Sequence, residues 1–229
     1  MARFSRLDTL VVTLRSGVMP LFFNPDLNAA IRLVEALDTA GVRVIEFTNR
    51  GDGAHLVFGE LEQECRRRMP DVVLGVGSVL DAGTASMYLN LGASFIVSPT
   101  LSAEVAVVCN RRKIAYMPGC ATPTEVARAE ELGCEIVKLF PARLGGPQLI
   151  SDLLAPCPWS RIMPTGGISP DRESLSSWFG AGAACVGMGS QLFPAAELQE
   201  GRWDAITERA STTLDLIAEL RPPLEEAWA

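Results

Sequence analysis

One pattern recurs along the chain and limits the folds that it can adopt. A segment rich in helix-forming residues ends in Leu-Gly or Ala-Gly, and a short apolar run follows, as at residues 40–41, 91–92, 132–133 and 181–182. Glycine after a helix adopts the left-handed conformation that ends the helix and turns the chain back toward a sheet. The repeating unit is therefore a helix followed by a strand, with a period of about 20 to 25 residues.

Eight apolar runs are predicted to be strands. They are apolar throughout rather than alternating, as expected for parallel strands that are buried on both faces. Eight such units close naturally into a (β/α)8 barrel. An open doubly wound sheet has the same pattern, but no GxGxxG follows the first strand, so the barrel is favoured. The predicted strands are 18–22, 42–47, 72–76, 94–97, 114–117, 135–139, 162–165 and 184–187.

The length of the chain agrees with one barrel. It has 229 residues, and no Pro/Gly/Ser-rich linker divides it. We therefore expect a single α/β domain over residues 1–229, a (β/α)8 TIM barrel with an extra N-terminal helix. The leading helix, at about 4–16, would cover the bottom of the barrel, and a trailing helix would run from about 203 to 220.

Charge and composition exclude several classes of partner. A formal net charge of −7 argues against binding to nucleic acid or to an anionic membrane surface, but not against small anionic ligands. One histidine and six cysteines without CxxC spacing predict neither a metal site nor a disulfide framework. No hydrophobic signal core opens the chain and no apolar run approaches membrane-spanning length, so a cytoplasmic location is expected.

The chain has only two lysines, and one of them stands in an apolar run. Lys113 lies in a basic cluster, where a surface role is expected, whereas Lys138 lies between Val137 and Leu139. Burying an unpaired ammonium is costly and favours the neutral amine, which is a nucleophile. The alternative is a lysine at a strand end whose ammonium extends to water.

Polar residues at the ends of the predicted strands are the other candidates, because barrels build their active sites there. Glu46, in the second strand, is a candidate proton shuttle, and Arg50 just after it is a candidate ligand for a substrate carboxylate. The alternative is a Glu46–Arg50 salt bridge that caps the strand. Ser78 offers a hydroxyl after the third strand, whereas Thr122 followed by Glu125 favours a helix N-cap.

Two glycine-rich turns follow the last two strands. Thr165, Gly166 and Gly167 end the seventh strand, and Gly189 and Ser190 end the eighth. Many barrels bind a phosphate at these two places, through backbone N–H groups. Tight loops also need glycine, but two such turns at neighbouring strands favour a phosphate site.

Taken together, these motifs resemble those of the class I aldolases that act on 2-keto-3-deoxy-6-phosphogluconate (KDPG) and 2-keto-4-hydroxyglutarate (KHG). The resemblance extends over about residues 17–194, in the same order. It rests on Glu46-x-x-x-Arg50, Gly75-x-Gly77-Ser78, Ser98-Pro99, Lys138-x-Phe140-Pro141-Ala142, Pro164-Thr165-Gly166-Gly167-Ile168-Ser169-Pro170 and Gly187-x-Gly189-Ser190.

The resemblance implies a function and a role for each residue. Lys138 would form the Schiff base, and Glu46 would act as general acid and base. A small 2-keto acid would be cleaved to pyruvate and an aldehyde, either glyceraldehyde 3-phosphate or glyoxylate. No cofactor would be needed, because the iminium supplies the electrophilic pull, and the protein would be a homotrimer. The implied substrate-binding residues are Arg50 and Ser78 for the pyruvyl carboxylate, Thr165 for orientation, and Gly166, Gly167, Gly189 and Ser190 for a terminal phosphate.

The sequence departs from the family pattern at two places, and two alternative functions are open. The family usually has threonine at the position of Ser78, and the segment 51–55 differs from its usual continuation, which leaves the roles of Asp52 and His55 open. His55 is expected to be exposed, in the first turn of a helix. A non-catalytic barrel that binds keto acids or sugar phosphates would not use a nucleophilic amine. A phosphate-binding isomerase or epimerase would not need Lys138, and metal-dependent epimerases need several histidines.

Overall fold

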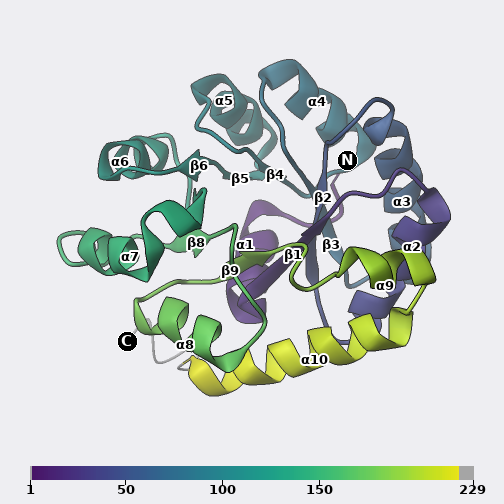
Figure 1. Cartoon of the computed structure of the whole chain (residues 1–229). Helices are drawn as coiled ribbons and strands as arrows, with labels where there is room; N and C mark the ends of the chain where they lie inside the picture. Colours follow the sequence, from purple (N-terminus) through teal and green to yellow (C-terminus); the bar gives the residue numbers. More distant parts are fainter. Residues whose placement is uncertain (1, 222–229) are drawn as a thin grey trace.

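A computed structural model describes residues 2–221 of the chain and shows an α/β fold with parallel strands inside and helices outside (Figure 1). The strands are β1 (Val18–Phe22), β2 (Val44–Thr48), β3 (Val73–Gly77), β4 (Phe95–Val97), β5 (Ala115–Met117), β6 (Gly119–Cys120), β7 (Val137–Leu139), β8 (Ile162–Pro164) and β9 (Val186–Met188). The helices are α1 (Arg6–Ser16), α2 (Leu27–Thr39), α3 (Ala54–Arg68), α4 (Ala82–Leu91), α5 (Ala103–Arg112), α6 (Pro123–Glu131), α7 (Gly146–Leu154), α8 (Arg172–Gly180), α9 (Ala195–Glu200) and α10 (Trp203–Leu220), with a 3-10 turn η1 (Ala142–Leu144).

The strands form two parallel sheets, with the orders β5-β4-β3-β2-β1-β9 and β6-β7-β8. Pro118, which has no N–H to donate, separates β5 from β6. The N–H of Gly119 nevertheless donates to the carbonyl of Ser98 after β4 (2.9 Å), so the two sheets meet there. They meet again where Thr165, just after β8, forms a parallel bridge with Gly187 of β9. The arrangement is TIM-barrel-like.

Each of the eight predicted apolar runs contains a strand, with bounds that differ by up to two residues. The trailing helix has the predicted bounds, and α1 precedes β1. Three short elements were not predicted: β6, η1 and α9. They are too short to produce a hydrophobic period that sequence patterns can detect.

The helix ends follow the local rules that the sequence indicated. Gly92 adopts a left-handed conformation (φ 108°) after α4, and Gly41, Gly133 and Gly182 are left-handed as well. The side chains of Thr122 and Glu125 form a capping box at the start of α6, which confirms the N-cap. A capping box satisfies backbone N–H groups that have no partner within the helix.

Two apolar clusters lie on opposite faces of the strands. The outer cluster fills the layer between strands and helices, where α10 packs along α2 and α8 (Figure 1). The inner cluster contains Met19 of β1, Val44 of β2 and Val73 of β3, together with Leu10 and Leu14 of α1. Side chains alternate between the two faces of a strand, so every second residue points inward.

Candidate active site

Polar side chains replace the inner apolar cluster toward the carboxyl ends of the strands. Val44 and Ile136 belong to the inner cluster. Glu46 and Lys138 lie two residues after them in the sequence, on the same face of the strands. By the same alternation Thr165 follows the inner residue Met163. The three polar residues are buried, with exposed fractions of 1% for Glu46, 6% for Lys138 and 4% for Thr165. The fold therefore places them inside the strand layer, although they lie far apart in sequence.

Lys138 is directed at Glu46 and not at solvent. Its Nζ lies 3.9 Å from Oε2 of Glu46, and its side chain is only 7% exposed. The interpretation of Lys138 as a strand-end lysine that extends to water is therefore wrong. Nζ also lies 5.1 Å from the centroid of the Phe140 ring, which covers one side of the amine.

Glycines make the room that these polar side chains occupy. A Cβ built at Gly77 of β3 would overlap the carboxylate of Glu46, and a Cβ at Gly187 of β9 would overlap the hydroxyl of Thr165. Glycine inside a strand otherwise weakens it, so its presence at both positions is explained by this close approach.

Two buried oxygen atoms at the site have no hydrogen-bond partner among residues 2–221. They are Oε2 of Glu46 and Oγ1 of Thr165. Buried polar atoms in folded proteins are almost always hydrogen-bonded, and exceptions cluster where a ligand or a reaction uses them. Both atoms therefore make this interior space a candidate ligand-binding site.

Burial raises the pKa of Glu46, and the nearby charges of Lys138 and Arg50 oppose this shift only in part. Arg50 is exposed just after β2 and forms no ion pair with Glu46 in the described part of the chain. The alternative of a Glu46–Arg50 salt bridge is therefore wrong. A carboxyl whose pKa lies closer to neutrality can both take up and release a proton during a reaction.

This raised pKa predicts how stability depends on pH. The pKa of Glu46 is higher in the folded than in the unfolded state, so the neutral carboxyl stabilises the fold. This contribution to the free energy of unfolding is complete below the unfolded-state pKa and is lost as pH rises through the folded-state pKa. The variant Glu46→Gln has no such loss. We expect its free energy of unfolding to rise relative to wild type between pH 5 and pH 8, by at most about 1.4 kcal/mol per pH unit. Urea unfolding across this range measures the difference, and a difference independent of pH would contradict the prediction.

The residues predicted to bind the substrate follow strands whose carboxyl ends lie toward this interior site. Arg50 and Ser78 follow the neighbouring strands β2 and β3, and Ser78 has a φ of 60°, in the left-handed region that residues other than glycine rarely adopt. Such conformations concentrate at functional sites. The remaining predicted residues lie in two adjacent turns, Gly166 and Gly167 after Thr165, and Gly189 and Ser190 after β9.

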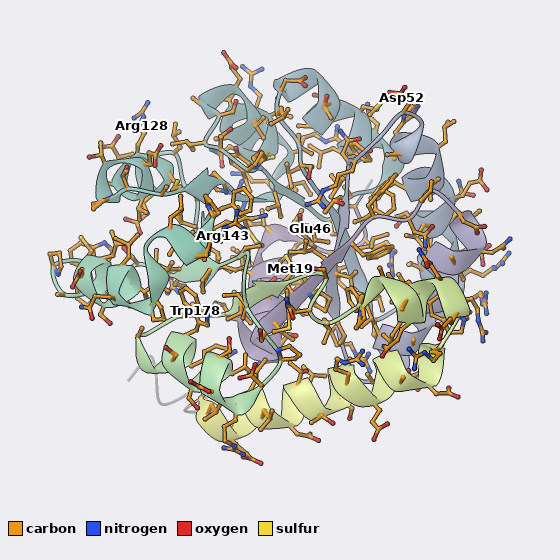
Figure 2. All side chains as sticks on the ribbon, in the orientation of Figure 1. Met19, Glu46, Asp52, Arg128, Arg143 and Trp178 are labelled. Atoms are coloured by element: carbon orange, nitrogen blue, oxygen red, sulfur yellow. The ribbon has the colours of Figure 1, made fainter. Side chains whose placement is uncertain are left out.

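One of the two departures from the family pattern, the segment 51–55, lies at the start of α3. His55 is half-buried in its first turn, and is thus less exposed than predicted. Asp52 is exposed, and Figure 2 shows it at the periphery, well apart from Glu46. Sequence reasoning gave no role to Phe140 or Arg143, although both come within five residues of Lys138 along the same chain segment.

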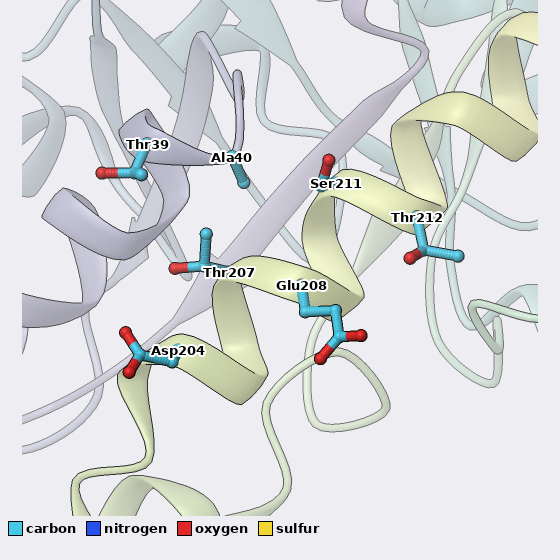
Figure 3. Close-up of a pocket in the computed structure, with 7 residues that line it drawn as sticks. All are labelled: Thr39, Ala40, Asp204, Thr207, Glu208, Ser211 and Thr212. Carbon is cyan, nitrogen blue, oxygen red and sulfur yellow. The ribbon is translucent and has the colours of Figure 1, made fainter.

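A separate groove of about 350 Å³ lies on the outside of the molecule, along α10 and the end of α2 (Figure 3). Its lining contains none of the predicted site residues. Within residues 2–221 no group of three or more His, Cys, Asp or Glu side chains is arranged to hold a metal ion. In the same part of the chain no helix is long and apolar enough to cross a membrane.

A buried lysine beside a buried carboxyl, at the carboxyl ends of the strands of a TIM-barrel-like fold, is the arrangement of an enzyme with an amine nucleophile, as in class I aldolases. Comparison with known families agrees. Residues 11–209 match the family described as KDPG and KHG aldolase, so the chain belongs to this family and is a carbon–carbon lyase.

Relatives of known name support this assignment. A 2-dehydro-3-deoxy-phosphogluconate aldolase of Treponema pallidum is 33% identical over 204 residues, which cover 89% of this chain and 94% of the relative. A KHG/KDPG aldolase of Escherichia coli is 31% identical over 203 residues, which cover 86% of this chain and 91% of the relative.

Two solved structures are also similar. A KDPG aldolase of Legionella pneumophila, with pyruvate captured as a covalent carbinolamine intermediate, is 28% identical with a TM-score of 0.81, covering 90% of this chain and 97% of that one. The 2-keto-3-deoxy-6-phosphogluconate aldolase of Zymomonas mobilis, with 3-phosphoglycerate, is 29% identical with a TM-score of 0.78. The match covers 93% of this chain and 97% of that one.

Proposed function

We propose that this chain cleaves a KDPG-like or KHG-like 2-keto-4-hydroxy acid to pyruvate and an aldehyde, with Lys138 as the nucleophile. The observation that carries the proposal is the buried Lys138 amine, 3.9 Å from the Glu46 carboxyl. The carbinolamine of pyruvate captured in the Legionella relative supports the same chemistry.

The mechanism follows from these two groups. The neutral amine of Lys138 attacks the C2 ketone and forms a carbinolamine. Loss of water, with Glu46 donating a proton to the departing hydroxyl, gives an iminium. The electron pair of the C3–C4 bond then moves into the iminium while the C4 hydroxyl gives its proton to Glu46, now a carboxylate, which releases the aldehyde and leaves an enamine. Protonation of C3 and hydrolysis of the imine release pyruvate and restore the amine.

The surrounding residues orient the substrate. Arg50 and Ser78 bind the pyruvyl carboxylate, since a guanidinium matches the geometry of a carboxylate and Ser78 presents its hydroxyl on the neighbouring strand end. The unpaired hydroxyl of Thr165 orients the ketone or the amine. A terminal phosphate lies against Gly166, Gly167, Gly189 and Ser190, as supported by the 3-phosphoglycerate in the Zymomonas relative.

The proposal includes the architecture around the site. It comprises one domain over 1–229, a full (β/α)8 barrel, and α1 as the extra helix that covers its amino end. The hydrogen bond and the bridge between the two sheets support closure of the barrel, and the presence of Leu10 and Leu14 of α1 in the inner cluster supports the position of the helix. A homotrimer accords with the family resemblance and with the exposed Leu56 and Leu80, and sedimentation equilibrium would test it.

Six unpaired cysteines accord with a cytoplasmic location, which fractionation of the source cell would test.

Reductive trapping tests the proposal. The protein is incubated with pyruvate, borohydride is added, and the peptides are analysed by mass spectrometry. We expect a reduced pyruvate adduct on the peptide that contains Lys138, because borohydride reduces an imine to a stable amine. Folded protein without an adduct would overturn the mechanism and favour the non-catalytic binding barrel. An adduct on Lys113 instead would show that the reaction is nonspecific.

A further inference from the structure

The 3-10 turn η1 follows the strand of Lys138 and packs against the glycine turn after β8. The N–H of Ala142 donates to the carbonyl of Thr165 (3.0 Å). A Cβ built at Gly166 would lie 3.7 Å from the ring of Phe140, and one at Gly167 would lie 3.5 Å from Cβ of Arg143. The backbone of Arg143 is therefore held at the edge of the Gly166–Gly167 turn.

The side chain of Arg143 is exposed, and in the view of Figure 2 it is seen toward the middle of the molecule rather than at the periphery. Figure 2 shows Arg143 on the side of η1 that faces the middle of the strands, the side on which Glu46 is also seen. Its guanidinium has no ion pair and no hydrogen bond with any other residue of the described range 2–221. In a chain with a net charge of −7, most arginines do have an acidic partner, as Arg128 has in Glu131 (2.6 Å).

Besides Arg143, four cations in residues 2–221 have neither an ion pair nor a hydrogen bond from the side chain, and they fall into two groups by position. Arg15, Arg111 and Lys113 lie in the last turn or at the C-cap of helices that lead into β1 and β5, which places them at the amino end of the strands. Arg50 and Arg143 instead follow β2 and β7, at the carboxyl end. Two such arginines thus follow different strands at the end of the fold that holds the candidate site, and only Arg50 has an assigned role.

We propose that Arg143 is a specificity-determining residue that binds the anionic group at the end of the substrate remote from the ketone. The inference rests on the proposed function, because Lys138 and Arg50 define where the ketone and its carboxylate lie. The ligand is a phosphate or a carboxylate. A guanidinium binds either one through paired N–H donors, and the N–H groups of the adjacent glycine turn supply further donors.

The test compares wild type with Arg143→Gln and Arg111→Gln. The second variant is a matched control, because it removes an unpaired arginine from the opposite end of the strands. Calorimetry measures binding of three ligands that share a 2-hydroxy carboxylate. They are 3-phosphoglycerate, with a phosphate at the far end, 2-hydroxyglutarate, with a carboxylate there, and glycerate, with a neutral hydroxyl. None is a ketone, so binding stays measurable even if trapping at Lys138 fails.

We expect Arg143→Gln to weaken binding of 3-phosphoglycerate, of 2-hydroxyglutarate or of both by at least about tenfold, with glycerate unchanged and Arg111→Gln without effect. The ligand that loses affinity identifies the anion as phosphate or carboxylate. Three outcomes would each overturn the inference. In the first, Arg143→Gln binds both ligands with two anionic groups within about twofold of wild type; in the second, glycerate loses as much affinity as they do; in the third, wild type binds none of the ligands.

Discussion

Replacing Lys138 by arginine is expected to lower kcat for aldol cleavage by about 10⁴-fold or more. A guanidinium remains protonated and cannot form the imine on which every later step depends. The substitution keeps a long basic side chain beside Glu46, so the loss reports the missing amine nucleophile rather than a missing side chain. Pyruvate release, coupled to lactate dehydrogenase, measures it.

Lys113→Arg is the matched control for this variant. Lys113 is exposed at the C-cap of α5 and is the only other lysine of the chain, so this change should leave kcat unaltered. A binding barrel would give wild-type ligand affinity for both variants and no turnover for any of them. An isomerase or epimerase would turn over its substrate equally well with arginine at position 138. Either result would contradict the aldolase mechanism.

Replacing Glu46 by glutamine is expected to lower kcat by about 10²–10⁴-fold, less than the loss at Lys138. The amine can still attack the ketone, but the buried carboxyl that moves protons is gone. The shape of the side chain is kept, so it still fits against Gly77. We expect borohydride to trap pyruvate on Lys138 in this variant, more slowly than in wild type.

Glu62→Gln provides a second buried carboxylate for comparison. Glu62 is also buried, but it lies in α3 and pairs with Arg3 and Arg66 outside the strands. Its substitution should lower the free energy of unfolding and leave kcat of the folded protein unchanged. If Glu46→Gln kept kcat within about threefold of wild type, Glu46 would be a structural partner of Lys138 and not the general acid and base.

Much of the fold could be predicted because its signals are local. The glycine caps, the capping box of Thr122 and Glu125, and the uninterrupted apolar runs depend on neighbours within a few residues. The exact strand bounds are not a local property, because the pairing partner decides where a ladder of hydrogen bonds begins. The break at Pro118 and the short strand β6 arise from such pairing, with β7 on one side and the end of β4 on the other.

The chemical character of the site was present in the sequence, since a lysine and a glutamate in apolar strands are costly unless they are used. Their relation to each other was not. Sequence alone left Lys138 free to extend to water and left Glu46 free to pair with Arg50. The tertiary structure decided both, because parallel strands bring every second residue into one interior and glycines at 77 and 187 leave the space for polar groups there. The position of Arg143 at the glycine turn likewise depends on contacts between segments more than twenty residues apart, which no local pattern encodes.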